Sequence, residues 1–152
     1  MTVYRLSNLR RADDLSGAGA RMGGGRWNKI GVSVLYTASS RALASLELMV
    51  HTTSIDLPNY YVMLMLIIPE DSMQTVSLDQ LPMGWNESEP PESIKAITEI
   101  WIAENRFLVL KVPSAVVTGD YNFLLNPAHP RMVEVKIIEK QPFRFDHRLT
   151  RP

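Results

Sequence analysis

The stretch from Tyr60 to Ile68 constrains the fold of this chain most, because it is a nearly continuous run of apolar side chains, YYVMLMLII. It is about half as long as the ~18 apolar residues that suggest a membrane-spanning helix. Short apolar runs are typical of strands buried on both faces. Pro69 should end the strand, because proline has no N–H to donate to a ladder. We therefore predict a central strand inside the core of a globular protein.

Weaker patterns predict the other elements and the fold class. Strands are expected at Val3–Leu6, Val32–Tyr36, Phe107–Val112 and Val133–Ile138, and helices at Arg41–His51, after Ser39 and Ser40 as N-caps, and near Ser93–Trp101. The glycine-rich segment Ser16–Gly25 and most of residues 70–98 are expected to be irregular. Strands dominate and do not alternate with helices, which favours the α+β class. The 152 residues show no repeat or internal boundary, which predicts one domain, 1–152.

Charge is balanced overall but unevenly distributed. The chain has 16 basic and 16 acidic residues. Residues 70–104 carry a net charge of −7, while residues 1–26 carry +3 and residues 106–152 carry +4. A neutral chain without a basic stripe is not expected to bind nucleic acid directly. The basic flanks could meet a small anion, and the acidic block is interpreted as a solvated face or a surface for a partner.

Several common classes of protein are disfavoured by simple absences in the sequence. There is no cysteine, which excludes disulfides and thiolate metal sites. The N-terminal MTVYRLSNLRRADDL lacks the apolar core of a signal peptide, so we expect a cytoplasmic protein without a membrane segment. His51, His129 and His147 lack zinc-site spacing, so no metal is predicted. Ser114 and His129 lack the GxSxG elbow of many serine hydrolases.

Glu47 is the most informative position of the predicted helix. At 100° per residue, Leu43, Leu46 and Val50 form an apolar stripe, and Glu47 falls among them. A buried carboxylate costs several kcal/mol unless it is paired. Glu47 is therefore a candidate catalytic group, and the alternative is a structural ion pair or an exposed edge of the helix.

Arg26, Tyr36 and Arg5 are further candidates for contacts with a ligand. Arg26 follows Gly23-Gly24-Gly25, where backbone amides and a guanidinium could approach an anion together. Tyr36 ends a predicted strand, and its ring could stack on a flat heterocycle. Arg5 lies inside a predicted strand, where an unpaired arginine is unusual. Each residue also has an ordinary interpretation, as a surface loop residue, a core tyrosine or an edge arginine.

Short motifs then follow one another along nearly the whole chain. They are GGGRWN at 23–28, LYTASSRALASLELMVH at 35–51, LPMGW at 81–85, LKVPSAVV at 110–117, NFLLNPAHP at 122–130 and FRFDHRL at 143–149. Together they resemble the RES family, which is named for conserved Arg, Glu and Ser positions. These positions correspond to Arg26, Glu47 and Ser114, and Arg5 and Tyr36 also fall on family positions.

The resemblance implies a fold, a substrate and a partner. RES proteins resemble ADP-ribosyltransferases, with two small, mostly antiparallel β-sheets around an NAD⁺ cleft. They are toxins of type II toxin–antitoxin pairs that use NAD⁺ as a substrate, with no prosthetic group, and arrest growth. The partner is typically an Xre-like helix-turn-helix antitoxin, in higher-order complexes that leave room for a homo-oligomer. One departure from the family pattern is Glu99-Ile100, where the family often has Gly-Asp.

The resemblance also implies roles for the candidate residues. Breaking the nicotinamide–ribose bond forms an oxocarbenium-like cation, which the carboxylate of Glu47 would stabilise. Tyr36 would stack on nicotinamide and complete the catalytic set with Glu47 and Arg26. Contacts with NAD⁺ are expected from Arg5, Arg26, Tyr36, Ser114 and Asn126.

Three hypotheses about the activity of the protein are left open. Members of the family degrade NAD⁺ by hydrolysis or phosphorolysis, and the sequence favours this degradation. The alternative is transfer of ADP-ribose to a protein. An arginine-directed transferase with a Glu-x-Glu pair is disfavoured, because Ser45 stands two residues before Glu47. A third hypothesis is a catalytically inactive module that binds NAD⁺ or an antitoxin, and retention of the candidate residues argues against it.

Overall fold

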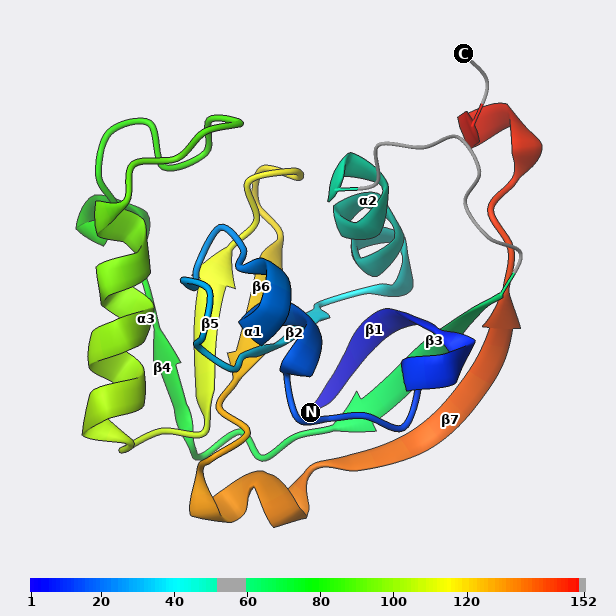
Figure 1. The fold of residues 1–152 in the computed structure, drawn as a ribbon, viewed down its shortest axis with the longest axis horizontal. Helices are drawn as coiled ribbons and strands as arrows, with labels where there is room; N and C mark the ends of the chain where they lie inside the picture. Colours follow the sequence, from blue (N-terminus) through cyan, green and yellow to red (C-terminus); the bar gives the residue numbers. More distant parts are fainter. Residues whose placement is uncertain (52–59, 151–152) are drawn as a thin grey trace.

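The computed structural model describes residues 1–51 and 60–150, and these form a mixed sheet with three α-helices (Figure 1). The sheet order is β4-β5-β6-β2-β1-β3-β7, and only the β4–β5 pair is parallel among the described strands. The strands are β1 (Thr2–Asn8), β2 (Leu35–Ala38), β3 (Tyr61–Ile67), β4 (Met73–Thr75), β5 (Val109–Pro113), β6 (Tyr121–Leu125) and β7 (Lys136–Phe143). The helices are α1 (Ala18–Gly23), α2 (Arg41–His51) and α3 (Ser93–Glu104), with 3₁₀ turns at Leu9–Arg11, Leu78–Gln80, Pro130–Glu134 and His147–Thr150. The predicted α+β class is confirmed.

The sheet consists of two halves that meet between β1 and β2. The register of β1 with β3 runs from Thr2–Ile67 to Asn8–Tyr61, whereas the described part of β1 pairs with β2 at Tyr4 and Ala38 alone. Figure 1 shows β4 and β5 on one side of α1, β6 passing behind it in this view, and β1, β3 and β7 on the other side, running at different angles. The expected two separate sheets are therefore found as two halves of one hydrogen-bonded sheet.

The apolar run at 60–68 forms β3, as predicted. Its side chains alternate between two clusters: Leu64 and Leu66 pack with the core between the sheet halves, and Met63 packs beneath α2. All three side chains are buried, but Ile67 is 45% exposed, so the burial expected on both faces is complete on one face and partial on the other. A third cluster, which includes Trp101, joins α3 to β5 and β6.

Helix α2 begins at the predicted residue, Arg41, and is described as far as His51. The Ser40 hydroxyl accepts the N–H of Leu43 at 3.0 Å, so it caps the first turn. Leu43 and Ala44 are buried against β1, β2 and β3. The apolar stripe predicted from Leu46 and Val50 is wrong, because these side chains are 38% and 59% exposed. The buried face of α2 is therefore narrower than the apolar pattern of its sequence indicates.

The glycine-rich segment is not irregular as predicted. Ala18–Gly23 forms α1, and glycines with positive φ flank it, at 71° for Gly17 and 69° for Gly24. Gly17 also lies so close to the backbone of Val34 that a Cβ would meet its nitrogen at 2.7 Å. A glycine therefore bounds α1 at each end, and Gly17 also permits the close approach to Val34. The residues between them keep helical geometry.

Two further strands were not predicted, and two predicted strands begin three residues later than expected: β2 at Leu35 in place of Val32, and the last strand. β4 is a short edge strand, and β6 begins with Tyr121 and Asn122, whose polarity hides the buried run that follows. The last strand is β7 at Lys136–Phe143, because the preceding residues form a 3₁₀ turn. β7 accommodates Pro142 because it lies at the edge of the sheet, where a missing N–H breaks no further pairing.

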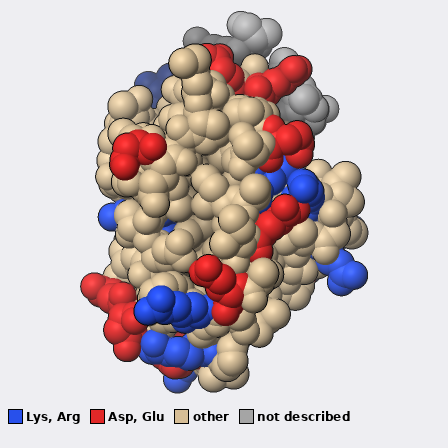
Figure 2. Space-filling view, turned by 90° about the vertical axis from the view of Figure 1, so that its left-hand side faces the viewer, with Lys and Arg blue, Asp and Glu red and all other residues tan. Residues whose placement is uncertain are grey.

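The acidic block at 70–104 is partly neutralised by ion pairs. Asp71 pairs with Arg131, Glu92 with Lys95, and Glu99 with Lys29. Figure 2 shows the face that carries α3, where acidic and basic side chains are interspersed around a broad uncharged area. This distribution agrees with the interpretation of the block as a solvated face.

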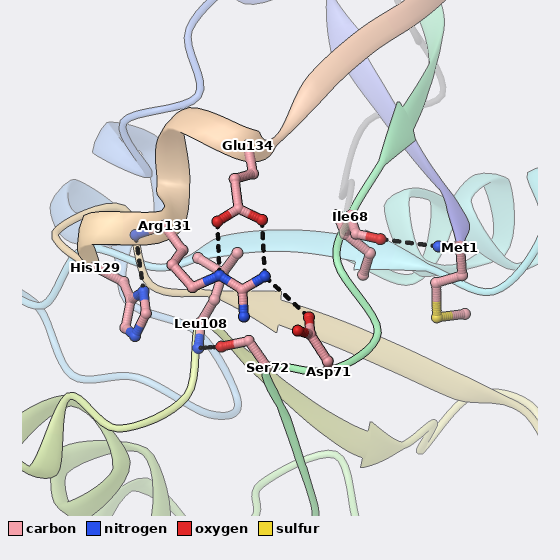
Figure 3. A network of polar contacts seen from close by, with 8 residues as sticks. All are labelled: Met1, Ile68, Asp71, Ser72, Leu108, His129, Arg131 and Glu134. Carbon is pink, nitrogen blue, oxygen red and sulfur yellow. Dashed lines mark hydrogen bonds and ion pairs between the residues drawn. The ribbon is translucent and has the colours of Figure 1, made fainter.

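A polar network holds the corner between β3, β5 and the 3₁₀ turn at Pro130–Glu134 (Figure 3). The Arg131 guanidinium donates to both carboxylate oxygens of Glu134, at 2.6 and 2.8 Å, and to Asp71 at 2.9 Å. These hydrogen bonds raise the pKa of Arg131 and lower those of the two carboxyls. Ser72 accepts the N–H of Leu108 at 2.9 Å and so ties the same corner to β5.

No described helix is long and apolar enough to cross a membrane.

Candidate active site

A cavity of about 590 Å³ opens where the two sheet halves diverge. This volume lies within the roughly 300–1,000 Å³ of typical small-molecule sites. β1, β2 and α2 form its walls, and the glycine-rich loop at 24–27 and Asn122 of β6 complete it. Four predicted residues line it: Arg5, Arg26, Tyr36 and Glu47. The structure therefore brings together side chains that are up to 42 positions apart in the sequence.

Glu47 is held by two donors from the opposite sheet half. Its Oε1 accepts the hydroxyl proton of Ser114 at 2.8 Å and the Nδ2 proton of Asn122 at 2.5 Å. The Ser114 oxygen itself accepts the N–H groups of Val116 and Val117, both at 3.0 Å. The serine proton is thereby directed toward Glu47. One carboxylate oxygen is fixed, and Oε2 has no hydrogen bond to a described residue.

Ser114 thus has a different position from the one expected. It does not line the cavity but lies behind Glu47 and orients its carboxylate. Asn122 was not singled out in the sequence, although it is the first residue of the NFLLNPAHP motif. The signal that could have found it is its register opposite Ala38, the last residue of β2.

Asn126 is not brought to the cavity. It follows the end of β6, its amide donates to Asn105 Oδ1 at 2.9 Å, and its own Oδ1 accepts the N–H of Ala128 at 3.0 Å. It lies four positions after Asn122 along the chain, which corresponds to about 13 Å at ~3.3 Å per residue of strand. The buried Asn126 side chain therefore secures a turn, while Asn122 occupies the site end of the strand.

Arg5 is a half-buried cation without an ion-pair partner among the described residues. Its Nη1 donates to the carbonyl oxygen of Tyr36 at 3.4 Å, which is a long contact, and its buried Nε has no partner in the described part of the chain. Burial lowers the pKa of Arg5 more than the Asp14 carboxylate raises it. A buried guanidinium with unsatisfied donors is unfavourable by itself and is well suited to an anionic ligand.

Tyr36 connects β2 to the glycine-rich loop. Its hydroxyl donates to Asn28 Oδ1 at 2.7 Å and accepts the Trp27 N–H at 3.2 Å. Burial raises the pKa of the phenol well above its ordinary value. The loop passes so close that a Cβ on Gly25 would lie 2.8 Å from the Tyr36 hydroxyl oxygen. The hydroxyl is therefore structural, and the ring is what Tyr36 offers to the cavity.

Arg26 lies at the cavity and also fastens a distant loop. Its Nη1 donates to the carbonyl oxygens of Trp85 and Glu87, at 2.7 and 2.8 Å. Trp27 and Trp85 pack together, with ring centroids 6.4 Å apart. Burial lowers the pKa of Arg26, and the Glu47 carboxylate acts in the opposite direction. Nε and Nη2 make no hydrogen bond to the described residues, so part of the guanidinium is available to a ligand.

Comparison with known proteins decides the family. The model of the RES domain matches residues 2–146. The chain belongs to the RES family. A RES relative from Sphingobium sp. (strain YBL2), named Prs ADP-ribosylating toxin, is 40% identical over 144 residues, which cover 92% of this chain and 89% of the relative. The Toxin Res of Photorhabdus laumondii is 33% identical, with 99% and 98% covered.

The RES fold is also found in a solved structure. The crystal structure of the M. tuberculosis MbcT–MbcA toxin–antitoxin complex contains a chain that superposes with a TM-score of 0.77. The match covers 98% of this chain and 86% of that chain, at 20% identity. This likeness concerns the fold, and it agrees with the α+β assignment.

The site combines one fixed carboxylate with two guanidinium groups and an aromatic ring. Glu47 is the one acidic side chain among the described residues that line the cavity. Within the described ranges, no three His, Asp or Glu side chains gather as metal ligands. Such a set can stabilise a developing positive charge beside Glu47 while the guanidinium groups hold negative charge elsewhere on the same ligand.

Proposed function

We propose that this RES-family chain is the toxin of a type II toxin–antitoxin pair and that it cleaves the nicotinamide–ribose bond of NAD⁺, which arrests growth. The observation that carries the proposal is the pairing of a fixed Glu47 carboxylate with the under-satisfied Arg5 guanidinium in one cavity. NAD⁺ has the matching charges, a cationic nicotinamide ring and an anionic diphosphate. The names of the relatives, Toxin Res and Prs ADP-ribosylating toxin, support the assignment to toxins.

Glu47 acts on the ribose. The bond between nicotinamide nitrogen and ribose carbon breaks with its electron pair on nicotinamide, which leaves positive charge on the ribosyl ring. Glu47 Oε1 is fixed by Ser114 and Asn122, so Oε2 can approach that ring or one of its hydroxyls without reorganising. Water or phosphate then adds to the ribose carbon and releases a proton.

The other residues bind and orient NAD⁺. Tyr36 presents its ring to nicotinamide, since its hydroxyl is already engaged by the glycine-rich loop. Arg5 and the unused nitrogens of Arg26 bind the diphosphate or ribose oxygens. Ser114 acts through Glu47 as a positioning residue, and we assign the polar contact expected of Asn126 to Asn122 instead.

Transfer of ADP-ribose to a protein is the second candidate. It is favoured by the name of the Sphingobium relative, which is 40% identical. It uses the same site and the same bond cleavage, with a protein nucleophile in place of water. Degradation of NAD⁺ is preferred, because the described lining of the cavity holds no second carboxylate to activate an acceptor.

The setting of the protein follows from the same assignment. We propose that residues 1–152 act as a single cytoplasmic RES domain that binds NAD⁺ as a substrate. Its partner is a cognate Xre-like helix-turn-helix antitoxin, and a homo-oligomer can form within that complex. A toxin–antitoxin complex with the same fold supports the first partner. DNA contacts belong to the antitoxin, and membrane contacts are not part of the proposal.

The test follows nicotinamide release by antitoxin-free protein, with and without phosphate in the buffer. Wild-type protein is expected to release nicotinamide, and Glu47→Gln is expected to lower the rate by at least about a hundredfold, the scale of one electrostatic catalytic group. Glu104→Gln, an exposed acid at the end of α3, is the control and should leave the rate unchanged. Equal rates in Glu47→Gln and wild type would sink the proposal.

The product identifies the acceptor. Free ADP-ribose in both buffers indicates hydrolysis, and a product that forms only with phosphate indicates phosphorolysis. Labelled NAD⁺ incubated with a cell extract measures transfer to protein, which would replace degradation as the function if label on protein accounts for the nicotinamide released.

A further inference from the structure

A second cavity lies beside the first and shares Arg5 with it. Its volume is about 250 Å³, and it is formed where β1 passes into the 3₁₀ turn at Leu9–Arg11, with α1, α2 and β3 closing its sides. Arg5, Leu6, Gly19 and Leu48 line both cavities. The second cavity therefore adjoins the site along these four residues, and we call it the side chamber.

Two arginines and one aspartate are the charged residues of this side chamber within the described chain. Arg5 reaches it from inside the sheet, Arg11 from the exposed turn, and Asp14 from the following loop. The Arg11 guanidinium makes no ion pair or hydrogen bond with a described residue, and the buried Arg5 Nε has no partner there either. The chamber therefore carries a net positive charge, and of the donors of its two arginines only Arg5 Nη1 has a described partner, the carbonyl oxygen of Tyr36 at 3.4 Å.

The neighbouring polar groups also favour a ligand that accepts hydrogen bonds. Asn8 Oδ1 is occupied by the N–H of Arg10 at 3.0 Å, so the amide NH₂ is the part of Asn8 that remains for a ligand. Asp14 Oδ1 accepts the Ser16 N–H at 2.9 Å, which fixes this carboxylate at the rim. The hydrogen bonds from Ser16 lower the pKa of Asp14, and the charges of Arg5 and Arg11 lower it as well. The negative charge of Asp14 therefore offsets part of the positive charge of the two arginines.

We propose that this side chamber is a phosphate-binding subsite in which Arg11 and Arg5 hold one phosphate group next to the cavity that contains Glu47. A guanidinium presents paired donors that match phosphate oxygens, and two of them from different elements define a direction of approach. The group comes either from the substrate, as one phosphate of its diphosphate, or from free inorganic phosphate. The chemistry of recognition is the same in both cases, and the inference builds on the proposed function of the main cavity.

The sequence offers a matched control for this subsite. Arg10 and Arg11 are consecutive, both exposed, and both in the same 3₁₀ turn, but only Arg11 lines the chamber. Arg10→Gln and Arg11→Gln therefore change the net charge equally. Asp14→Asn gives a change of opposite sign, because the amide oxygen can still accept the Ser16 N–H while the opposing charge is removed.

The experiment measures binding of inorganic phosphate and of ADP-ribose to antitoxin-free protein by calorimetry at low ionic strength. Arg11→Gln is expected to weaken binding of at least one of them by about tenfold or more, as expected for a lost charge-assisted hydrogen bond. Arg10→Gln should bind like wild type, and Asp14→Asn should bind more tightly. Circular dichroism of each variant confirms that it is folded.

Competition between the two probes identifies the source of the phosphate group. Displacement of phosphate by ADP-ribose assigns the chamber to the substrate, and simultaneous binding assigns it to free phosphate. Unchanged affinity of Arg11→Gln for both probes, or equal losses in Arg10→Gln and Arg11→Gln, would overturn the proposal. Neither probe requires turnover, so a failure of NAD⁺ cleavage and a failure of this subsite are recorded separately.

Discussion

The Ser114 hydroxyl donates to the Glu47 carboxylate at 2.8 Å, although the two residues are 67 positions apart in the sequence. Two backbone N–H groups fill the acceptor positions of the same hydroxyl, so its single proton points at the carboxylate. The most specific polar contact of the site is thus a link between a loop after β5 and helix α2. This link explains how a serine outside the cavity can control the group that acts inside it.

Replacing Ser114 with alanine should therefore impair activity without removing a substrate contact. The N–H groups of Val116 and Val117 lose their acceptor, and the fold should lose about 1–3 kcal/mol of unfolding free energy. Nicotinamide release should fall about tenfold in kcat, with little change in KM for NAD⁺, because binding groups are untouched. Ser45→Ala is the control, since Ser45 bonds only the backbone of its own helix among the described residues. A large rise in KM with unchanged kcat would contradict the positioning role.

The Arg5 side chain should destabilise the fold and strengthen the binding of NAD⁺. Replacing it with methionine removes a buried guanidinium whose Nε has no described partner, while a side chain of similar length fills the space. Unfolding free energy in urea is expected to rise by about 1–2 kcal/mol, as when apolar residues replace poorly compensated buried charges. KM for NAD⁺ should rise at least about tenfold.

The control for this exchange is Arg21→Met, because Arg21 is exposed on α1 and its side chain makes no hydrogen bond or ion pair with the described residues. Its stability and KM should stay within error of wild type. A less stable Arg5→Met protein would show that the guanidinium contributes to the fold through interactions stronger than its 3.4 Å contact with Tyr36.

Tyr36 should make the fold sensitive to alkaline pH. Its pKa is raised in the folded protein, so the folded phenol keeps its proton at pH values where the unfolded phenol, with its ordinary pKa near 10, has lost it. Stability from this group is complete below pH 10 and is lost as pH rises further, by about 1.4 kcal/mol per pH unit. The unfolding free energy of Tyr36→Phe should be lower at pH 8, because Asn28 and Trp27 lose a partner, but it should decline less above pH 10. Parallel pH profiles of the two proteins would refute this explanation.

Gly23 and Gly25 of the GGGRWN motif should differ in how well they tolerate replacement by alanine. A Cβ on Gly25 would lie 2.8 Å from the Tyr36 hydroxyl oxygen and 2.9 Å from Asn28 Oδ1, so Gly25→Ala must displace one of them. We expect a loss of about 1–3 kcal/mol in unfolding free energy, together with reduced NAD⁺ turnover. A Cβ on Gly23 would meet nothing within 4 Å, and Gly23→Ala should be neutral or stabilising by up to about 1 kcal/mol. Similar losses in both variants would point to backbone flexibility and not to the close contact.

Local patterns predicted the elements that rest on local causes. The apolar run at 60–68 contains β3, and Ser40 followed by a regular helix sequence specified the start of α2. The sequence also indicated that Glu47 was special, although for a partly incorrect reason. Leu46 and Val50 are exposed, so Glu47 is oriented by contacts across the cavity and not by an apolar stripe around it.

Local sequence patterns did not predict the contacts between distant segments. Asn122 and Asn126 are both flanked by apolar residues in the sequence, and only the pairing of β6 with β2 determines which one reaches the site. The bonds from Arg26 to the carbonyls of Trp85 and Glu87 depend in the same way on a loop about sixty residues away. Backbone acceptors carry no signal in the side-chain sequence, so such an arginine is easily interpreted as a free anion binder.

The single pair between Tyr4 and Ala38 has a consequence for how a protein of this kind can diversify. One half of the sheet carries Arg5, and the other half carries Tyr36 and Asn122, so each half contributes its own part of the site. With so little backbone joining them, substitutions that tilt one half would widen or narrow the cavity while leaving the ladders inside both halves intact. Substrate fit and strand pairing can then change in separate evolutionary steps, provided that the core shared by the two halves, which holds Leu35 from one and Leu64 from the other, repacks.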